Sequence, residues 1–289
     1  MRKMHMDKKK MRMDRKKRKK KILSGISWVY ALIIYAFFYI PVIVMMVYSF
    51  NDSRNNIVWQ GFTTKYYVKL MSDAELWKIF GNTMLIAVVS TVIAVVIGTM
   101  GAVGLKDAKF KGKGLISNSL YFPIVIPEIV LAVATLMLFS MANVKLSILT
   151  MILGNTTLLL PYIFITVKSR LVGIDPSIEE ASLDLGANRA YTFMKITLPG
   201  IVPGVVSGAF MGFSLALEDL VISSFLADAS TTNLSMKVYS MIKKGVSPEI
   251  NALATLVFLV FVIGVAGYTI INTVRDKRLA AIQLPKDNY

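Results

Sequence analysis

Six long apolar stretches decide what this 289-residue chain can fold into. Each exceeds the roughly 20 residues that an α-helix needs to cross a bilayer. The overall composition agrees, because 55% hydrophobic residues and a mean hydropathy of +0.60 are too apolar for a soluble domain. We therefore expect an all-α membrane protein with six spans, at residues 28–50, 79–105, 115–141, 146–167, 201–227 and 251–274.

The composition provides little for catalysis. The chain has no cysteine, and its one histidine, His5, lies in a charged N-terminal stretch, so we expect no disulfide and no metal site. Most intramembrane protease and metalloenzyme designs need such residues, and we expect a protein that is not an enzyme. An intramembrane enzyme that uses an aspartyl pair stays open as an alternative.

The positive charge is concentrated at one end. The net charge is +16, and 13 of the 33 Lys and Arg residues lie between Arg2 and Lys21, directly before an apolar run. This is the flank that the positive-inside rule predicts for a cytoplasmic end, and no aromatic residues for base stacking are interleaved. We expect 1–21 to be a cytoplasmic tail that contacts lipid headgroups and not nucleic acid.

The remaining basic residues fix the expected topology. With the N-terminus inside, cytoplasmic segments hold 25 of the 33 Lys and Arg residues. This distribution favours a multi-pass protein of the cytoplasmic membrane with both termini in the cytoplasm. We expect a six-span domain at 22–278, a cytoplasmic tail at 279–289 and a cytoplasmic loop at 168–199.

That loop contains a short amphipathic helix. Asp175 suits an N-cap, Pro176 suits the first helical position, and Gly186 suits the helix end. The pattern predicts a helix over 176–185 that needs a protein groove to dock in. One side would carry Ile178, Ala181 and Leu185, and another would carry Glu180 and Asp184.

The same segment resembles a known family motif. Glu180-Ala181-Ser182, then Gly186, then Ile196-Thr197-Leu198-Pro199 is similar to the EAA motif of ABC importer permeases, with Ser182 in place of the second alanine. The resemblance implies type I importer architecture, with a coupling helix between spans four and five that sits in a cleft of a separate ATP-binding subunit. The ATPase-coupling residues that it implies are Glu180, Ala181, Asp184, Gly186, Ile196, Leu198 and Pro199.

Residues 213–225 and 236–255 further resemble permeases of spermidine and putrescine importers. The resemblance implies a complex with a sister permease, two ATP-binding subunits and an extracytoplasmic polyamine-binding protein. This chain has no Gly-x-x-x-x-Gly-Lys-Ser/Thr loop, so we expect it to bind no cofactor, with ATP and Mg held by the partner subunits. Import of another small solute, or a non-transporting scaffold, are the alternatives.

Carboxylates within the spans are the candidate substrate path. Glu128 follows Pro127 in the third span, and Glu218 and Asp219 lie in the fifth. A carboxylate near the bilayer centre costs about 2.5–3.5 kcal/mol, so we expect these to face a water-filled path where they balance an ammonium group. The alternatives are a helix end at the headgroups or pairing with a neighbouring helix. Tyr121 and Phe122 are candidate cation–π faces or simple packing residues.

Three glycines repeat every fourth residue in the fifth span, at Gly204, Gly208 and Gly212. Such a row lets two helix backbones approach closely. The sequence predicts a helix-packing surface there and leaves open whether the neighbour belongs to this chain or to a sister subunit.

Overall fold

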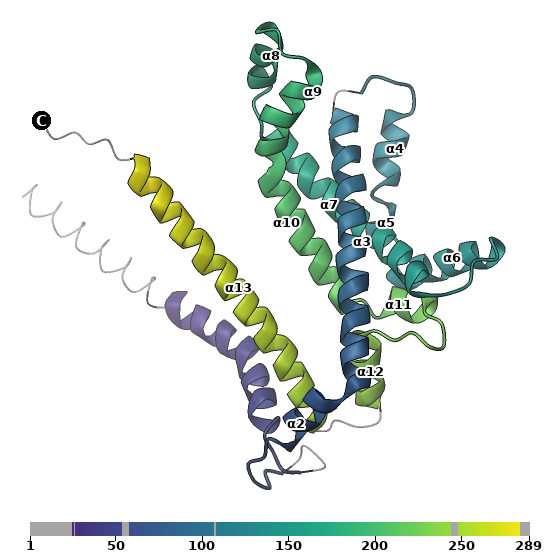
Figure 1. Cartoon of the computed structure of the whole chain (residues 1–289), viewed down its shortest axis with the longest axis vertical. Coiled ribbons are helices and arrows are strands. Elements are labelled where there is room, and N and C mark those ends of the chain that lie inside the picture. The colour runs from purple at the N-terminus through teal and green to yellow at the C-terminus, as the bar shows by residue number, and fades with distance from the viewer. Residues whose placement is uncertain (1–24, 26, 54–57, 107, 244–247, 284–289) are drawn as a thin grey trace, which may run out of the picture. The chain divides into compact units, whose positions relative to one another are not determined.

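The computed structural model describes residues 25, 27–53, 58–106, 108–243 and 248–283. The chain divides into two compact units, one formed by residues 1–72 with 245–289 and the other by 73–244. The described residues are almost entirely helical, with one isolated β-bridge between Asn51 and Phe62 (Figure 1). The expected basic tail at 1–21 lies outside the described residues.

The helices have the following bounds. A first helix covers Ser27–Tyr48. It is followed by α2 (Lys65–Ser72), α3 (Ala74–Lys106), α4 (Lys113–Ser119), α5 (Phe122–Val125), α6 (Glu128–Met141), α7 (Ile148–Val172), α8 (Pro176–Asp184), α9 (Arg189–Thr192), the π-helix η1 (Phe193–Thr197), α10 (Leu198–Glu218), α11 (Val221–Leu226), α12 (Leu234–Lys243) and α13 (Pro248–Gln283).

Among the described residues, five helical stretches are long and apolar enough to cross a membrane, and a bent pair makes a sixth. The bent pair is Lys113–Val125 with Glu128–Met141, whose axes differ by 113°. Pro127 explains the break, since a proline disfavours helical backbone in the residue before it, and Ile126 is extended with ψ 132°. The third expected span is therefore not one continuous helix.

The core of the 73–244 unit is a bundle of α3, α7 and α10. Small residues of α3, among them Ala87 and Ala94, let the backbone approach Ile163 and Phe164 of α7, and Ile201 of α10 completes the cluster. A second cluster joins α6 and α11 to α3 and α7 through Ala132, Met151, Ile222 and Leu226. Both clusters position the ends of α7, where the polar features described below lie.

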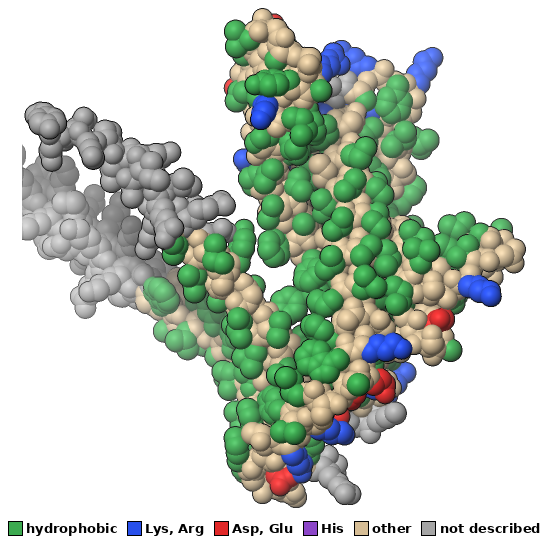
Figure 2. All heavy atoms as spheres, viewed as in Figure 1, with side chains coloured by type: hydrophobic (Ala, Val, Ile, Leu, Met, Phe, Trp, Pro, Cys, Tyr) green, Lys and Arg blue, Asp and Glu red, His purple; other side chains and the backbone are tan. Residues whose placement is uncertain are grey.

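Hydrophobic side chains also cover the outside of the bundle. Figure 2 shows them along the flanks of α3 and α10, with Lys, Arg, Asp and Glu gathered toward the helix ends. Val92 and Val96 of α3 and Val206 and Phe210 of α10 are all exposed. An apolar belt between charged ends is the surface that a bilayer requires.

Two helix boundaries differ from the expected spans. The helix that contains the second expected span begins at Ala74, because the Asp73 carboxylate accepts a hydrogen bond from Leu76 N at 3.0 Å and caps the helix five residues before residue 79. The fifth span is interrupted after Glu218, and the chain continues in the short helix α11. A short amphipathic helix, α12, precedes the last span.

The glycine row of α10 packs against α7 of the same chain. A Cβ on Gly204 would lie 2.7 Å from Arg170 Cβ, and one on Gly212 would lie 3.2 Å from Ile163 Cδ1. A Cβ on Gly208 would lie 3.4 Å from Ile163 Cα. All three glycines are buried, so their lack of a side chain allows the α7–α10 contact.

In the other unit, the start of α13 packs against α2. Lys69 Nζ donates to Glu249 Oε2 at 2.9 Å, and Ile250, Ala252 and Leu253 are buried beside this ion pair. Beyond its first turns α13 exposes apolar side chains, as does the Ser27–Tyr48 helix.

Candidate functional site

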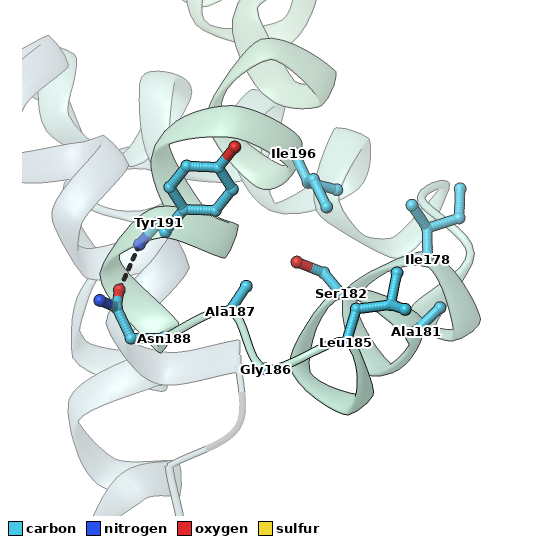
Figure 3. A pocket seen from close by; sticks show the side chains of 9 residues that line it. All are labelled: Ile178, Ala181, Ser182, Leu185, Gly186, Ala187, Asn188, Tyr191 and Ile196. Carbon is cyan, nitrogen blue, oxygen red and sulfur yellow. Dashed lines mark hydrogen bonds between the residues drawn. The ribbon is translucent and has the colours of Figure 1, made fainter.

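A groove lies between α8 and the short helices that follow it (Figure 3). Its volume is about 610 Å³. Side chains of α8 stand on one side of it, and those of α9 and η1 stand on the other. The lining residues are Ile178, Ala181, Ser182, Leu185, Gly186, Ala187, Asn188, Tyr191 and Ile196.

Local sequence signals build this groove. The Asp175 carboxylate accepts a hydrogen bond from Ser177 N at 2.9 Å, which starts α8 and lowers the pKa of Asp175. Gly186 ends the helix with φ +87°, a left-handed conformation that other residues rarely adopt. Asn188 then accepts from Tyr191 N at 2.8 Å and starts α9. The predicted cap and glycine stop are confirmed, and the helix ends at Asp184 with Leu185 as its C-cap.

The groove is apolar and open. Leu185 is 90% exposed, and the side chains of Ile178 and Tyr191 are both more than half exposed. Asp175, Glu180 and Asp184 of the same segment are exposed as well, so polar residues accompany this apolar cluster. Apolar residues gathered in a concave, polar-rimmed surface are typical of protein-interaction sites.

The structure separates the motif residues by environment. Ala181, Gly186 and Ile196 line the groove. Glu180 and Asp184 are exposed on α8 and do not line it, and Pro199 is exposed in the first turn of α10. Leu198 packs against the α3–α7–α10 core.

Sequence reasoning missed Glu179, which lies next to the motif glutamate. Its Oε2 accepts from Lys106 Nζ at 2.8 Å and its Oε1 accepts from Thr197 Oγ1 at 2.8 Å. Burial alone would raise the pKa of Glu179, but these two hydrogen bonds and the Lys106 charge outweigh it and lower the pKa below its ordinary value. Glu179 is therefore ionised at neutral pH. The signal in the sequence that could have identified Glu179 is the adjacent pair of glutamates, Glu179 and Glu180, on an amphipathic helix.

A second polar region lies at the breaks in the third and fifth spans. Glu128 begins α6, directly after the proline break, and lies beside the Asp219 carboxylate and near Glu218. Glu128 is half-buried and Glu218 is exposed. Among the described residues, neither takes part in an ion pair within 4 Å. The fold thus brings Glu128 close to two adjacent carboxylates that lie 90 and 91 residues later in the sequence.

Asp219 has a different environment from the one expected. It is only 3% exposed, so it does not face a water-filled path. Its Oδ1 accepts from Ile222 N at 2.9 Å, and its Oδ2 accepts from Ser223 N at 2.9 Å, Ser223 Oγ at 2.6 Å and Asn155 Nδ2 at 3.0 Å. Asp219 therefore caps α11 and joins it to α7. Asn155, fully buried in α7, was not singled out from the sequence.

The two aromatic candidates lie elsewhere. The Tyr121 ring contacts Phe164 edge-on, and Lys168 Nζ lies 5.6 Å from its centre and donates to its hydroxyl at 3.2 Å. Tyr121, a candidate cation–π face or packing residue, therefore packs on Phe164 and holds a lysine of this chain at its hydroxyl. Phe122 is exposed at the start of α5.

Replacing Asp219 with asparagine is expected to lower the free energy of unfolding by roughly 3 kcal/mol. An asparagine side chain has only one acceptor oxygen, and its NH₂ group would face donors that now bond to the Asp219 carboxylate. The apparent melting temperature of the detergent-solubilised protein measures this loss. Asp73→Asn is the matched control, since Asp73 caps α3 through one oxygen and asparagine caps equally well. Equal melting temperatures for the two variants would contradict the structural role of Asp219.

Comparison with known proteins gives a consistent result. Residues 94–281 match the family described as binding-protein-dependent transport system inner membrane component. The chain is 41% identical over 244 residues to the spermidine/putrescine transport system permease protein PotC of Escherichia coli K12, a match that covers 84% of this chain and 92% of that protein. It is 35% identical over 257 residues to the putrescine transport system permease protein PotI of the same strain, covering 86% and 92%.

Solved structures share the fold. The inward-facing MetNI methionine ABC transporter superposes with a TM-score of 0.58 at 23% identity, covering 71% of this chain and 99% of that one. A bacterial alginate ABC transporter, in complex with a periplasmic protein bound to an alginate pentasaccharide, gives 0.62 at 19% identity, covering 81% and 91%.

Proposed function

The chain belongs to the family of binding-protein-dependent transport system inner membrane components, and from this premise we propose that it is the permease subunit of an ATP-driven polyamine importer. The PotC and PotI relatives, named for spermidine and putrescine transport, support the substrate class. The pair Glu128 and Glu218 supports it independently, because carboxylates balance the charge of a passing polyamine. Import of another small solute by the same architecture is the alternative.

The groove beside α8 carries the coupling part of the proposal. It presents exposed Leu185, Ile178 and Tyr191, an apolar surface that a partner protein would cover. The sequence has no phosphate-binding loop, so the energy for transport comes from a partner. Two ATP-binding subunits, which hold ATP and Mg, would each engage one permease, with α8 as the coupling helix of this one.

The substrate path in the proposal runs past the breaks at Pro127 and Asp219. Glu128 and Glu218 supply its negative charge, and Asp219 holds the adjoining wall in place through α11. Exposed Phe122 is an aromatic candidate on the same broken span, whereas Tyr121 is engaged by Lys168. The backbone carbonyls freed at a break in a span serve as further acceptors for an amine.

The assembly follows from the family and the charge distribution. A sister permease and an extracytoplasmic polyamine-binding protein complete the complex, and the alginate transporter is a relative in fold whose structure includes a bound periplasmic protein. The excess of Lys and Arg in the N-terminal tail and in the segments around α4 and α8 supports a cytoplasmic location for both termini and for the groove.

ATP hydrolysis by the purified complex tests the substrate class. The complex is assayed in nanodiscs with binding proteins loaded with spermidine, putrescine, an amino acid or a sugar. We expect the polyamine-loaded proteins to raise the ATPase rate several-fold above that with unloaded protein, and the others to leave it unchanged. If only the binding proteins loaded with an amino acid or a sugar raised the ATPase rate, the result would support import of another small solute.

A further inference from the structure

Glu179 points away from the groove and into the molecule. Its side chain is 20% exposed, and each carboxylate oxygen is engaged by a different element, since Lys106 is the last residue of α3 and Thr197 is the last residue of η1. Glu180, the next residue, is exposed on α8. The two adjacent glutamates therefore face different surroundings, one inside the subunit and one outside.

A second polar contact fixes the same helix. Ser182 Oγ lies 3.0 Å from Thr192 Oγ1, and both side chains are buried. Ser182 stands at the position where the EAA pattern has alanine, so this chain has gained a hydroxyl that joins α8 to α9. Together with the Thr197 bond, this contact ties α8 to the segment that leads into α10.

Chain connectivity joins α8 to α7 on one side and to α9 and η1 on the other. It does not join α8 to α3, which ends 70 residues earlier in the sequence. The Lys106–Glu179 bond crosses that separation, and α3 in turn packs along both α7 and α10. If α3 moves together with α8, the three core helices α3, α7 and α10 shift as one body. The displacement of α8 is then not absorbed by the bending of a loop.

We propose that the Glu179 latch, formed by Glu179, Lys106 and Thr197, makes α3 follow α8 and so transmits partner-driven motion of α8 to the whole bundle. The latch rests on the proposed coupling function and adds to it a positioning residue outside the motif. Glu179 does not contact the partner; it acts through α3 and η1. Its ionised state at neutral pH and its two part-buried, charge-assisted hydrogen bonds give the latch its stiffness.

The test is the number of substrate molecules transported per ATP hydrolysed, measured with the complete complex in proteoliposomes. Glu179→Gln and Lys106→Gln each remove one charge of the pair, and Glu179→Gln also keeps the side-chain shape. We expect each to lower transport per ATP about tenfold while the ATP-binding subunit still co-purifies. Exchange of the charges, Glu179→Lys with Lys106→Glu, is expected to restore most of the loss that Glu179→Lys alone causes.

Glu75→Gln is the matched control, because Glu75 forms an ion pair with Lys237 at the opposite end of α3. We expect its transport per ATP to equal that of the unmodified complex. Unchanged transport per ATP in Glu179→Gln, or a charge exchange that recovers nothing, would overturn the latch. Loss of the ATP-binding subunit in Glu179→Gln would also overturn it, since Glu179 would then serve docking. Failure of the proposed function is distinguishable, because the unmodified complex would then show no coupled transport.

Discussion

Replacing Leu185 with aspartate is expected to abolish co-purification of the ATP-binding subunit and, with it, ATP-dependent uptake. Leu185 is 90% exposed at the mouth of the groove, so the change costs the isolated subunit little. Burying a leucine in a partner contributes about 1.5–3 kcal/mol, and burying an unpaired carboxylate there is strongly unfavourable. The loss of affinity should therefore exceed a hundredfold. Pull-down of the tagged permease, followed by quantification of the ATP-binding subunit, measures it.

Leu183→Asp is the matched control for this variant. Leu183 is also exposed, but it does not line the groove, and two residues along a helix turn a side chain by about 200°. We expect Leu183→Asp to retain the ATP-binding subunit. Equal retention in both variants would show that the groove is not the docking surface.

The double variant Glu128→Gln with Glu218→Gln is expected to lower polyamine uptake at least tenfold without loss of the ATP-binding subunit. Both substitutions preserve shape and remove two carboxylates that form no ion pair among the described residues. A hydrogen bond to a charged partner contributes roughly 1.5–3 kcal/mol, so a narrow path without its two ammonium-binding carboxylates passes a polyamine much more slowly. Uptake of radiolabelled spermidine by cells or proteoliposomes measures the effect.

Glu75→Gln removes one carboxylate from the surface of α3 and is expected to transport normally. Normal uptake by the Glu128→Gln, Glu218→Gln protein would contradict the acidic path. If the Glu128→Gln, Glu218→Gln protein instead lost the ATP-binding subunit, Glu128 and Glu218 would belong to the fold and not to the path.

The helical architecture could be predicted from the sequence because it depends on signals within short segments of the chain. Long apolar runs predicted the membrane-spanning helices, and Asp175, Pro176 and Gly186 predicted both ends of α8, as the structure confirms. The resemblance at Glu180–Pro199 predicted the importer-permease fold that the comparisons support. Each of these inferences needed only the identity of residues within one segment.

The remaining features depend on contacts between distant segments. The sequence predicted Asp219 to lie on the substrate path. Its structural role could not be predicted, because its partner Asn155 lies 64 residues earlier in the sequence. Glu179 was not distinguished from Glu180 because Lys106 lies 73 residues away. The neighbour of the α10 glycines could not be assigned for the same reason, since a small-residue row indicates close packing without naming the partner helix.

A single engineered cysteine gives the most direct test of the claim that α8 docks the ATPase. The chain has no native cysteine, so Ala181→Cys, which lines the groove, can carry a short maleimide photo-crosslinker as its only attachment site. Ala142→Cys, also exposed, is the control, because Ala142 is the C-cap of α6 in the loop that leads to the start of α7, whereas α8 follows the end of α7. The 25 residues of α7 span about 37 Å. We expect illumination of the complex to join the Ala181→Cys permease to the ATP-binding subunit and the Ala142→Cys permease not to react with it. A crosslink from Ala142→Cys alone, or none from Ala181→Cys in a complex that transports polyamine, would contradict the account.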